Sequence, residues 1–173
     1  MMPKNPLIFA LHATSRGFGY VVFEGPFAPY DWGMVTARGD KNATCLRKLE
    51  KMLDRFIPET LLLEEATSVA NRSDRIGRLY KAIGNLCISR NIDVVIYKLG
   101  DIKACFASVG ARTRQEIAET VARQIEAIGH RKPKPRKPWQ SEDRRMSMFC
   151  AAALVLTHYQ LGASSLFDEL MER

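Results

Sequence analysis

The chain has 173 residues, with 26 Lys or Arg against 19 Asp or Glu and a formal net charge of +7. This length suits one compact domain, expected over residues 1–161 with a short C-terminal tail at 162–173. The four cysteines are scattered without a C-x-x-C pair, which argues against a zinc ribbon or disulfide scaffold and fits the cytoplasm. No apolar stretch reaches ~18 residues, so we expect no membrane association.

Two apolar runs near the N-terminus, Leu7–Leu11 and Phe18–Phe23, are separated by a short polar loop. This pattern predicts an antiparallel hairpin. His12 stands directly after the first run. Such a polar side chain at the end of a buried strand either points into a functional site or is a loop histidine held by a hydrogen bond. The spacing alone leaves both interpretations open.

The remaining elements follow from apolar patterns and breaker residues. We expect further strands at Trp32–Thr36, Thr60–Leu63 and Asp93–Tyr97. We expect helices at about Ala43–Phe56, Ser73–Arg90, Asp101–Ala107 and Arg114–Gly129. Thr67–Asn71 is interpreted as a loop. Ser141 is expected to cap a last long helix, with a separate short helix over Ser164–Arg173.

Leaving the terminus aside, the predicted order is three strands, then helix, strand, helix, strand and three helices. Three antiparallel strands followed by strands reached through helical crossovers indicate an α/β fold. The predicted architecture is a mixed five-stranded sheet flanked by helices.

Acidic residues stand at two informative places. Glu64 and Glu65 directly follow the strand Thr60–Leu63, where they are either solvent-exposed or a metal ligand and general base at the carboxyl edge of the sheet. Glu142 and Asp143 lie in the first turn of the predicted last helix, where carboxylates also stabilise a helix N-terminus by ~0.3–1 kcal/mol. Carboxylates from these two places suit Mg²⁺, and paired metals can clamp a phosphoryl displacement.

A basic stretch before the last helix carries five cations and no acid, namely Arg131, Lys132, Lys134, Arg136 and Lys137. Three interspersed prolines keep the stretch extended and non-helical. Together with the net charge, it predicts contacts with the phosphates of a nucleic acid. A solvated linker would have a similar composition.

Several segments resemble the RuvC family of Holliday-junction resolvases, within the ribonuclease H-like superfamily. Ile8–Tyr20 is similar to the family's opening hairpin, through Ser15-Arg16 and Gly19-Tyr20. Leu63-Glu64 resembles the second acidic position, Asp143 the acid that opens the last helix, and Ala151–His158 the rest of that helix. The resemblance runs from about Leu7 to His158. It implies a ribonuclease H-like fold, a homodimer, and structure-selective cleavage of branched DNA with Mg²⁺ or Mn²⁺.

The resemblance also implies residue roles. The catalytic and metal-binding residues would be His12, Glu64 and Asp143. Ile102-Lys103 and the stretch from Gly110 to Ile117 resemble a region whose basic residues face DNA. The DNA-binding residues would therefore be Arg16, Lys103 and Arg114 with the basic stretch Arg131, Lys132, Lys134, Arg136 and Lys137; ordinary surface charge is the alternative for Lys103 and Arg114.

The departures from the family concern the metal site. His12 stands where the family has its first Asp, and a neutral imidazole offers one free nitrogen, so it cannot bridge two metals as a carboxylate can. Met146 and Ser147 stand one turn after Asp143, where the family has a further acid or His, and Glu142 would point about 100° away. Alignment on the alanine run instead puts the family's acids at Ser147 and Cys150.

These departures leave the metal open between one ion such as Mn²⁺, held by His12, Glu64 and Asp143, and none. The sequence is therefore consistent with three functional hypotheses. The first is a RuvC-like DNA-binding endonuclease with weakened or altered activity. The second is a relative that binds DNA junctions and cuts nothing. The third is a protein-interaction module.

Overall fold

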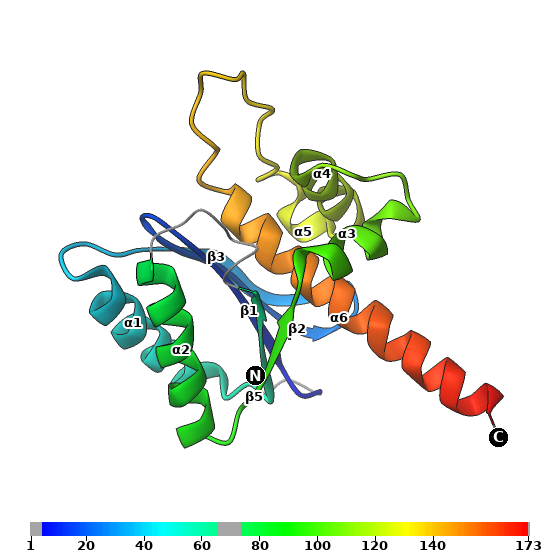
Figure 1. The fold of residues 1–173 in the computed structure, drawn as a ribbon, viewed down its shortest axis with the longest axis horizontal. Helices are drawn as coiled ribbons and strands as arrows, with labels where there is room; N and C mark the ends of the chain where they lie inside the picture. The colour runs from blue at the N-terminus through cyan, green and yellow to red at the C-terminus, as the bar shows by residue number, and fades with distance from the viewer. Residues whose placement is uncertain (1–4, 66–73, 173) are drawn as a thin grey trace.

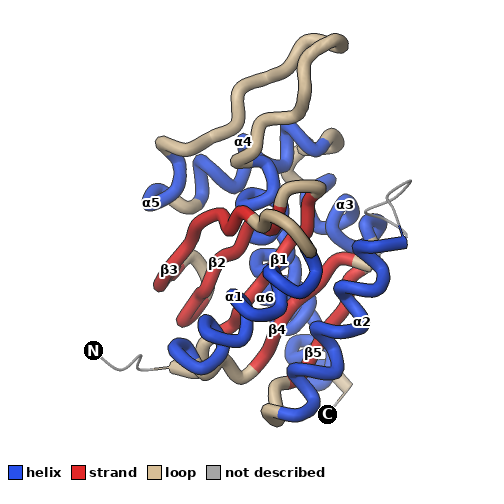
Figure 2. Tube along the Cα trace, turned by 90° about the vertical axis from the view of Figure 1, so that its left-hand side faces the viewer, coloured by secondary structure: helices blue, strands red, loops and turns tan. Residues whose placement is uncertain are grey.

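The computed structural model describes residues 5–65 and 74–172, with residues 163–169 described by their backbone alone. A single five-stranded sheet lies at its centre in the order β3-β2-β1-β4-β5. Helices cover both faces of this sheet, as Figures 1 and 2 show. The predicted α/β architecture, a mixed five-stranded sheet flanked by helices, is confirmed.

The sheet is mixed because its first three strands form a meander and its last two are reached through helices. β1 (Ile8–Thr14) pairs antiparallel with β2 (Gly17–Gly25), which pairs antiparallel with β3 (Ala28–Thr36). β4 (Thr60–Glu64) runs parallel to β1 and to β5 (Asp93–Tyr97). The carboxyl ends of β1, β4 and β5 therefore meet at one edge of the sheet.

In the described part of the chain, two helices cover one face of the sheet and four belong to the other side. α1 (Lys41–Phe56) and α2 (Asp74–Ser89) enclose a core with Phe9, Leu11 and the other residues of that face. The second core lies beneath α6 (Met146–Met171), together with α3 (Leu99–Ala107), α4 (Arg114–Gln124) and α5 (Glu126–Gly129). Within the described ranges, no helix has the length and hydrophobicity needed to cross a membrane.

Strand alternation decides which face carries His12. Ile8 and Ala10 belong to the core beneath α6, whereas Phe9 and Leu11 belong to the other core. Because side chains alternate along a strand, His12 points to the α6 side. Leu62 of β4 is also in the α6 core, so Glu64 points to the same side.

The predicted elements are largely confirmed, with corrections to several bounds. The first strand continues past Leu11 to Thr14, so His12 lies within it rather than after it. The third strand begins at Ala28, earlier than predicted. The helix expected from Arg114 to Gly129 is broken at Ile125, whose backbone (φ −117°, ψ 87°) is not helical. The Ser164–Arg173 stretch is not a separate helix, because α6 continues to Met171. Thr67–Asn71, Ser73 and Arg173 lie outside the described residues.

The start of the last helix was also predicted wrongly. The helix begins at Met146, so Ser141 does not cap it. The physical reason is a turn at Asp143, whose carboxylate accepts a hydrogen bond from the backbone N–H of Arg145 (2.9 Å). Short acidic side chains favour such turns over helix. Residues 130–145, which we call the arm, therefore reach the helix later than the sequence suggests (Figure 1).

The start of α6 packs directly on β2 at Gly19. A Cβ added there would lie 2.4 Å from the backbone nitrogen of Met148 and 2.4 Å from the carbonyl carbon of Ser147. Backbone atoms of a helix cannot move independently of the rest of the helix to relieve such a clash. We therefore expect Gly19→Ala to lower the free energy of unfolding by about 1–3 kcal/mol, the range typical of overpacking.

Urea denaturation measures this effect, and Gly84→Ala is the matched control. Gly84 lies in α2, and an added Cβ would meet nothing within 4 Å. Because alanine favours helix over glycine, the control is expected to gain about 0.5–1 kcal/mol. Equal stability of the two variants would contradict the close approach of α6 to β2.

Candidate nucleic-acid interface

His12 and Glu64 meet at the carboxyl edge of the sheet. They are 1% and 3% exposed, and His12 Nε2 lies 3.5 Å from Glu64 Oε2. The parallel pairing of β1 with β4 produces this approach, since Ala10 pairs with Leu62 two residues earlier on each strand. The structure thus brings together two of the three predicted catalytic residues.

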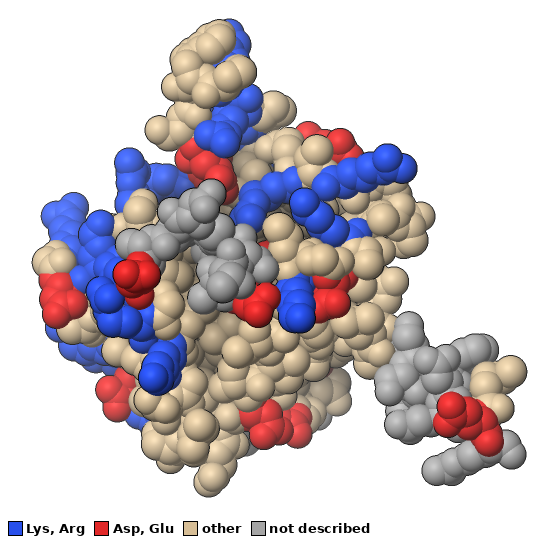
Figure 3. Space-filling model, in the orientation of Figure 1, with Lys and Arg blue, Asp and Glu red and all other residues tan. Residues whose placement is uncertain are grey.

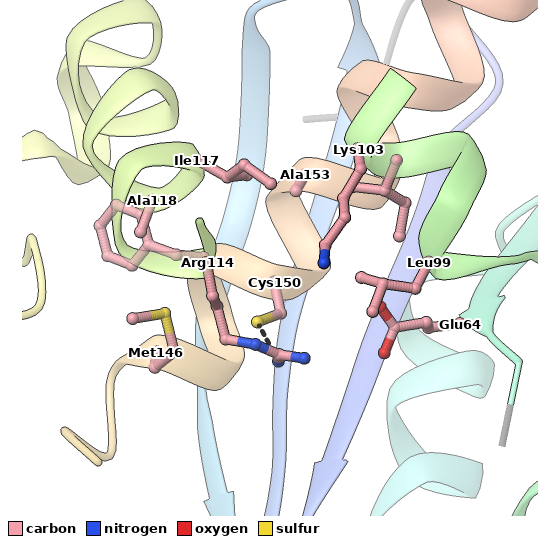
Figure 4. Close-up of a pocket in the computed structure, with 11 residues that line it drawn as sticks. Glu64, Leu99, Lys103, Arg114, Ile117, Ala118, Met146, Cys150 and Ala153 are labelled. Atoms are coloured by element: carbon pink, nitrogen blue, oxygen red, sulfur yellow. Dashed lines mark hydrogen bonds between the residues drawn. The ribbon is translucent and has the colours of Figure 1, made fainter. Parts of the chain in front are cut away.

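A cavity of about 170 Å³ opens beside Glu64. Lys103 of α3, Arg114 of α4 and Cys150 of α6 also line it, so four elements contribute. Figure 4 shows the Arg114 guanidinium extending between Cys150 and Glu64, with Lys103 pointing into the same space. Two predicted DNA-binding residues therefore share a pocket with the acid of β4.

Arg114 is the central cation of this pocket. Its Nη1 donates a hydrogen bond to Cys150 Sγ (3.1 Å) and lies 3.4 Å from His12 Nε2. The pKa of Arg114 is raised, first by the Cys150 thiol and then by the carboxylates of Glu64 and Glu142, although burial opposes the shift. The guanidinium therefore remains charged and supplies positive charge next to Glu64.

Cys150 is not an activated nucleophile. Burial raises the pKa of its thiol to about 11, although the Arg114 charge partly lowers it. The thiol is therefore protonated at neutral pH, and the thiolate is the form that attacks electrophiles and ligates metals.

Arg114 and Glu64 compete for one nitrogen of His12. Arginine can only donate, so a hydrogen bond from Arg114 requires an unprotonated Nε2. An ion pair with Glu64 requires a protonated Nε2 instead. The proton on His12 thus decides whether the imidazole associates more closely with the cation or with the carboxylate.

Asp143 is placed elsewhere. It lies on the turn before α6, lines a different pocket with Thr14 and Ser147, and accepts side-chain hydrogen bonds from Arg145 (2.9 and 3.1 Å). Its carboxylate also accepts the backbone N–H of Lys134 (3.3 Å). The hydrogen bonds from Arg145 are the largest cause of a pKa lowered to about 2. Asp143 therefore stabilises the base of the arm, and Cys150 instead occupies the α6 position beside Glu64.

The residues at the carboxyl edge do not fit the two-metal site implied by the resemblance. Among the described residues, no three His, Cys, Asp or Glu side chains are grouped so that they could hold a metal ion. Mg²⁺ prefers several oxygen ligands, whereas Glu64 is joined here by an imidazole and a protonated thiol. Arg114 also holds a positive charge where a metal would need negative neighbours.

Basic residues continue away from the pocket in two directions. The five cations between Arg131 and Lys137 are exposed, and the arm is held to α4 by a hydrogen bond from Gln115 Nε2 to the Pro133 carbonyl (3.0 Å). On the other side, Arg16 lines a depression together with four further cations. We call these five the basic rim: Arg16, Arg38, Arg47, Lys48 and Arg144.

Figure 3 shows Lys and Arg side chains gathered near α1, on the arm and over α3 and α4. Sequence reasoning missed four of the five rim residues. They lie in the loop between β3 and α1, in α1 and just before α6. No continuous basic stretch in the sequence indicates that they form one surface. Only the fold joins them, partly through a hydrogen bond from Arg144 Nη2 to Thr36 Oγ1 (3.2 Å).

Comparison with known proteins identifies the fold. No family model matches the chain, and no curated protein matches it either. Among solved structures, T. thermophilus RuvC in complex with a Holliday junction substrate matches with a TM-score of 0.69 and 15% identity, covering 93% of this chain and 97% of that chain. A second Thermus thermophilus RuvC structure matches with a TM-score of 0.66 and 19% identity, over 92% and 96% of the two chains. The chain has the ribonuclease H-like fold of RuvC.

Proposed function

We propose that this protein binds branched DNA through its basic surface and contacts phosphates directly with Arg114 and Lys103, without a catalytic metal. The observation that carries this proposal is the Arg114 guanidinium, which lies beside Glu64, His12 and Cys150 in the pocket. A fixed cation there attracts a phosphate and repels a divalent ion. The arm and the basic rim extend the positive surface beyond this pocket.

The preference for branched DNA is supported by the solved RuvC structure of the same fold, whose partner is a Holliday junction. The alternative is a structure-selective endonuclease of that kind, and it is favoured by the buried Glu64 at the strand end. The protein-interaction module has no comparable support from the charge distribution. Homodimer formation stays a prediction.

Salt titration tests DNA binding. We expect the logarithm of the association constant for a four-way junction to fall linearly with the logarithm of the salt concentration, by about 0.9 for each phosphate contact. Lys103→Gln and Arg47→Gln should each make the slope shallower by about 1. Arg90→Gln is the charge-matched control, because Arg90 is paired with Glu50 and Asp54 on α1.

Incubation of the bound junction with Mg²⁺ or Mn²⁺ separates the two DNA-processing functions. The proposal expects the junction to remain intact. Cleavage that disappears in Glu64→Gln would establish the endonuclease instead. If the protein does not bind DNA, or binds it with an affinity that does not depend on salt, the protein-interaction module becomes the favoured hypothesis.

A further inference from the structure

The arm presents an exposed tryptophan that the pocket does not use. Trp139 is 76% exposed, whereas Trp32, the other tryptophan, packs partly against the core beneath α6. Figures 1 and 2 show the arm projecting from the body beside α4 and the start of α6. The indole is therefore exposed on the arm and belongs to neither core.

Trp139 stands in a turn of the arm that several hydrogen bonds hold. Gln140 organises it, because its backbone N–H donates to the Lys137 carbonyl (2.9 Å) and its side-chain oxygen accepts from the Lys137 N–H (3.0 Å). Arg136 Nη1 also donates to the Gln140 carbonyl (3.1 Å). At its base, the arm is held by Asp143 and Gln115. These hydrogen bonds already restrict the backbone around Trp139, so less conformational entropy is lost when a ligand binds to the ring.

The surroundings of the ring indicate its ligand. Lys137 Nζ lies 5.3 Å from the centre of the Trp139 ring, and Arg136 and Lys134 are also exposed on the arm. No acid occurs between Arg131 and Gln140. An aromatic face among cations matches a nucleobase joined to its phosphates, since such sites combine stacking with a positively charged track.

We propose that the Trp139 indole stacks on a nucleobase exposed at the branch of a DNA junction, while Arg136 and Lys137 hold the adjoining phosphates. This inference rests on the proposed DNA binding and assigns the arm a separate role in it. Bases inside continuous duplex are covered by their neighbours on both sides, so the indole finds a free face only where stacking is interrupted. Trp139 then supplies preference for branched over continuous DNA.

The experiment compares labelled four-way junction with a linear duplex of the same sequence by fluorescence anisotropy. Trp139→Ala should weaken junction binding by about 5- to 150-fold, the effect of losing one stacked base, and change duplex binding by less than about twofold. Trp139→Phe should retain most of the junction affinity. Lys137→Gln should weaken both DNAs similarly.

A second measurement reports the indole itself. In Trp32→Phe, Trp139 is the only tryptophan, and junction DNA should quench its fluorescence more than duplex does. The inference would be overturned if Trp139→Ala lost the same affinity for junction and duplex, or lost none. It would also be overturned if the Trp139 fluorescence did not change when the protein is saturated with junction DNA. In each case the proposed DNA binding would still stand. A fluorescence change that follows protein concentration without DNA would assign the ring to self-association and also overturn the inference. If the wild-type protein binds neither DNA, both proposals fail.

Discussion

Arg114→Met is expected to lower the free energy of unfolding by about 2–3 kcal/mol at neutral pH. The guanidinium is the cation beside Glu64, and that carboxylate is only 3% exposed. The guanidinium charge attracts that carboxylate across the pocket, and without this attraction less of the desolvation cost of the buried carboxylate is offset. Half-burial of Arg114 lets some water reach the site, so the expected loss lies below the largest values known for such pairs.

A double-mutant cycle isolates this interaction. Glu64→Gln in the Arg114→Met background should restore much of the lost stability, because the amide carries no charge. The matched control is Arg112→Met, since Arg112 is exposed two residues before Arg114; such surface changes stay within about 0.5 kcal/mol. Guanidinium denaturation provides the measurement. Additive losses in the double variant would show that Arg114 does not balance Glu64.

Combining His12→Asp, Cys150→Asp and Arg114→Ala is expected to create a divalent-metal site. These changes surround Glu64 with two further carboxylates and remove the competing cation. Calorimetric titration should then detect Mn²⁺ binding at least about tenfold tighter than in the wild-type protein. Cleavage of a four-way junction in the presence of Mn²⁺ would be the functional consequence, since carboxylate-held metals activate phosphoryl transfer.

Two additions to the triple variant identify the ligands. Glu64→Gln should abolish Mn²⁺ binding, whereas Asp143→Asn should leave it unchanged because Asp143 is held by Arg145. The opposite pattern would place the metal at the turn before α6. Circular dichroism of each variant checks that the sheet and helices have formed, so that a missing metal signal reports on the ligands.

The contrast between Glu64 and Asp143 shows how far sequence patterns reach. Glu64 was predicted correctly at the end of a buried strand, because an apolar run followed by an acid fixes the strand end locally. Asp143 was assigned to a helix start by the same kind of reasoning, but hydrogen bonds from Arg145 and Lys134 hold it in a turn. Those partners compete with the helix, and their strength is not visible in apolar periodicity.

The sequence by itself determined the mixed sheet, its helical crossovers, and the positions of Glu64 and the basic stretch of the arm. These features follow from apolar spacing, breaker residues and charge, which act over a few residues. Only the tertiary structure decided that Arg114 lies against Cys150 and near His12, that Cys150 rather than Asp143 stands beside Glu64, and that five dispersed cations form the basic rim. The reason is that these contacts join residues far apart in the chain, so their geometry depends on how whole elements pack.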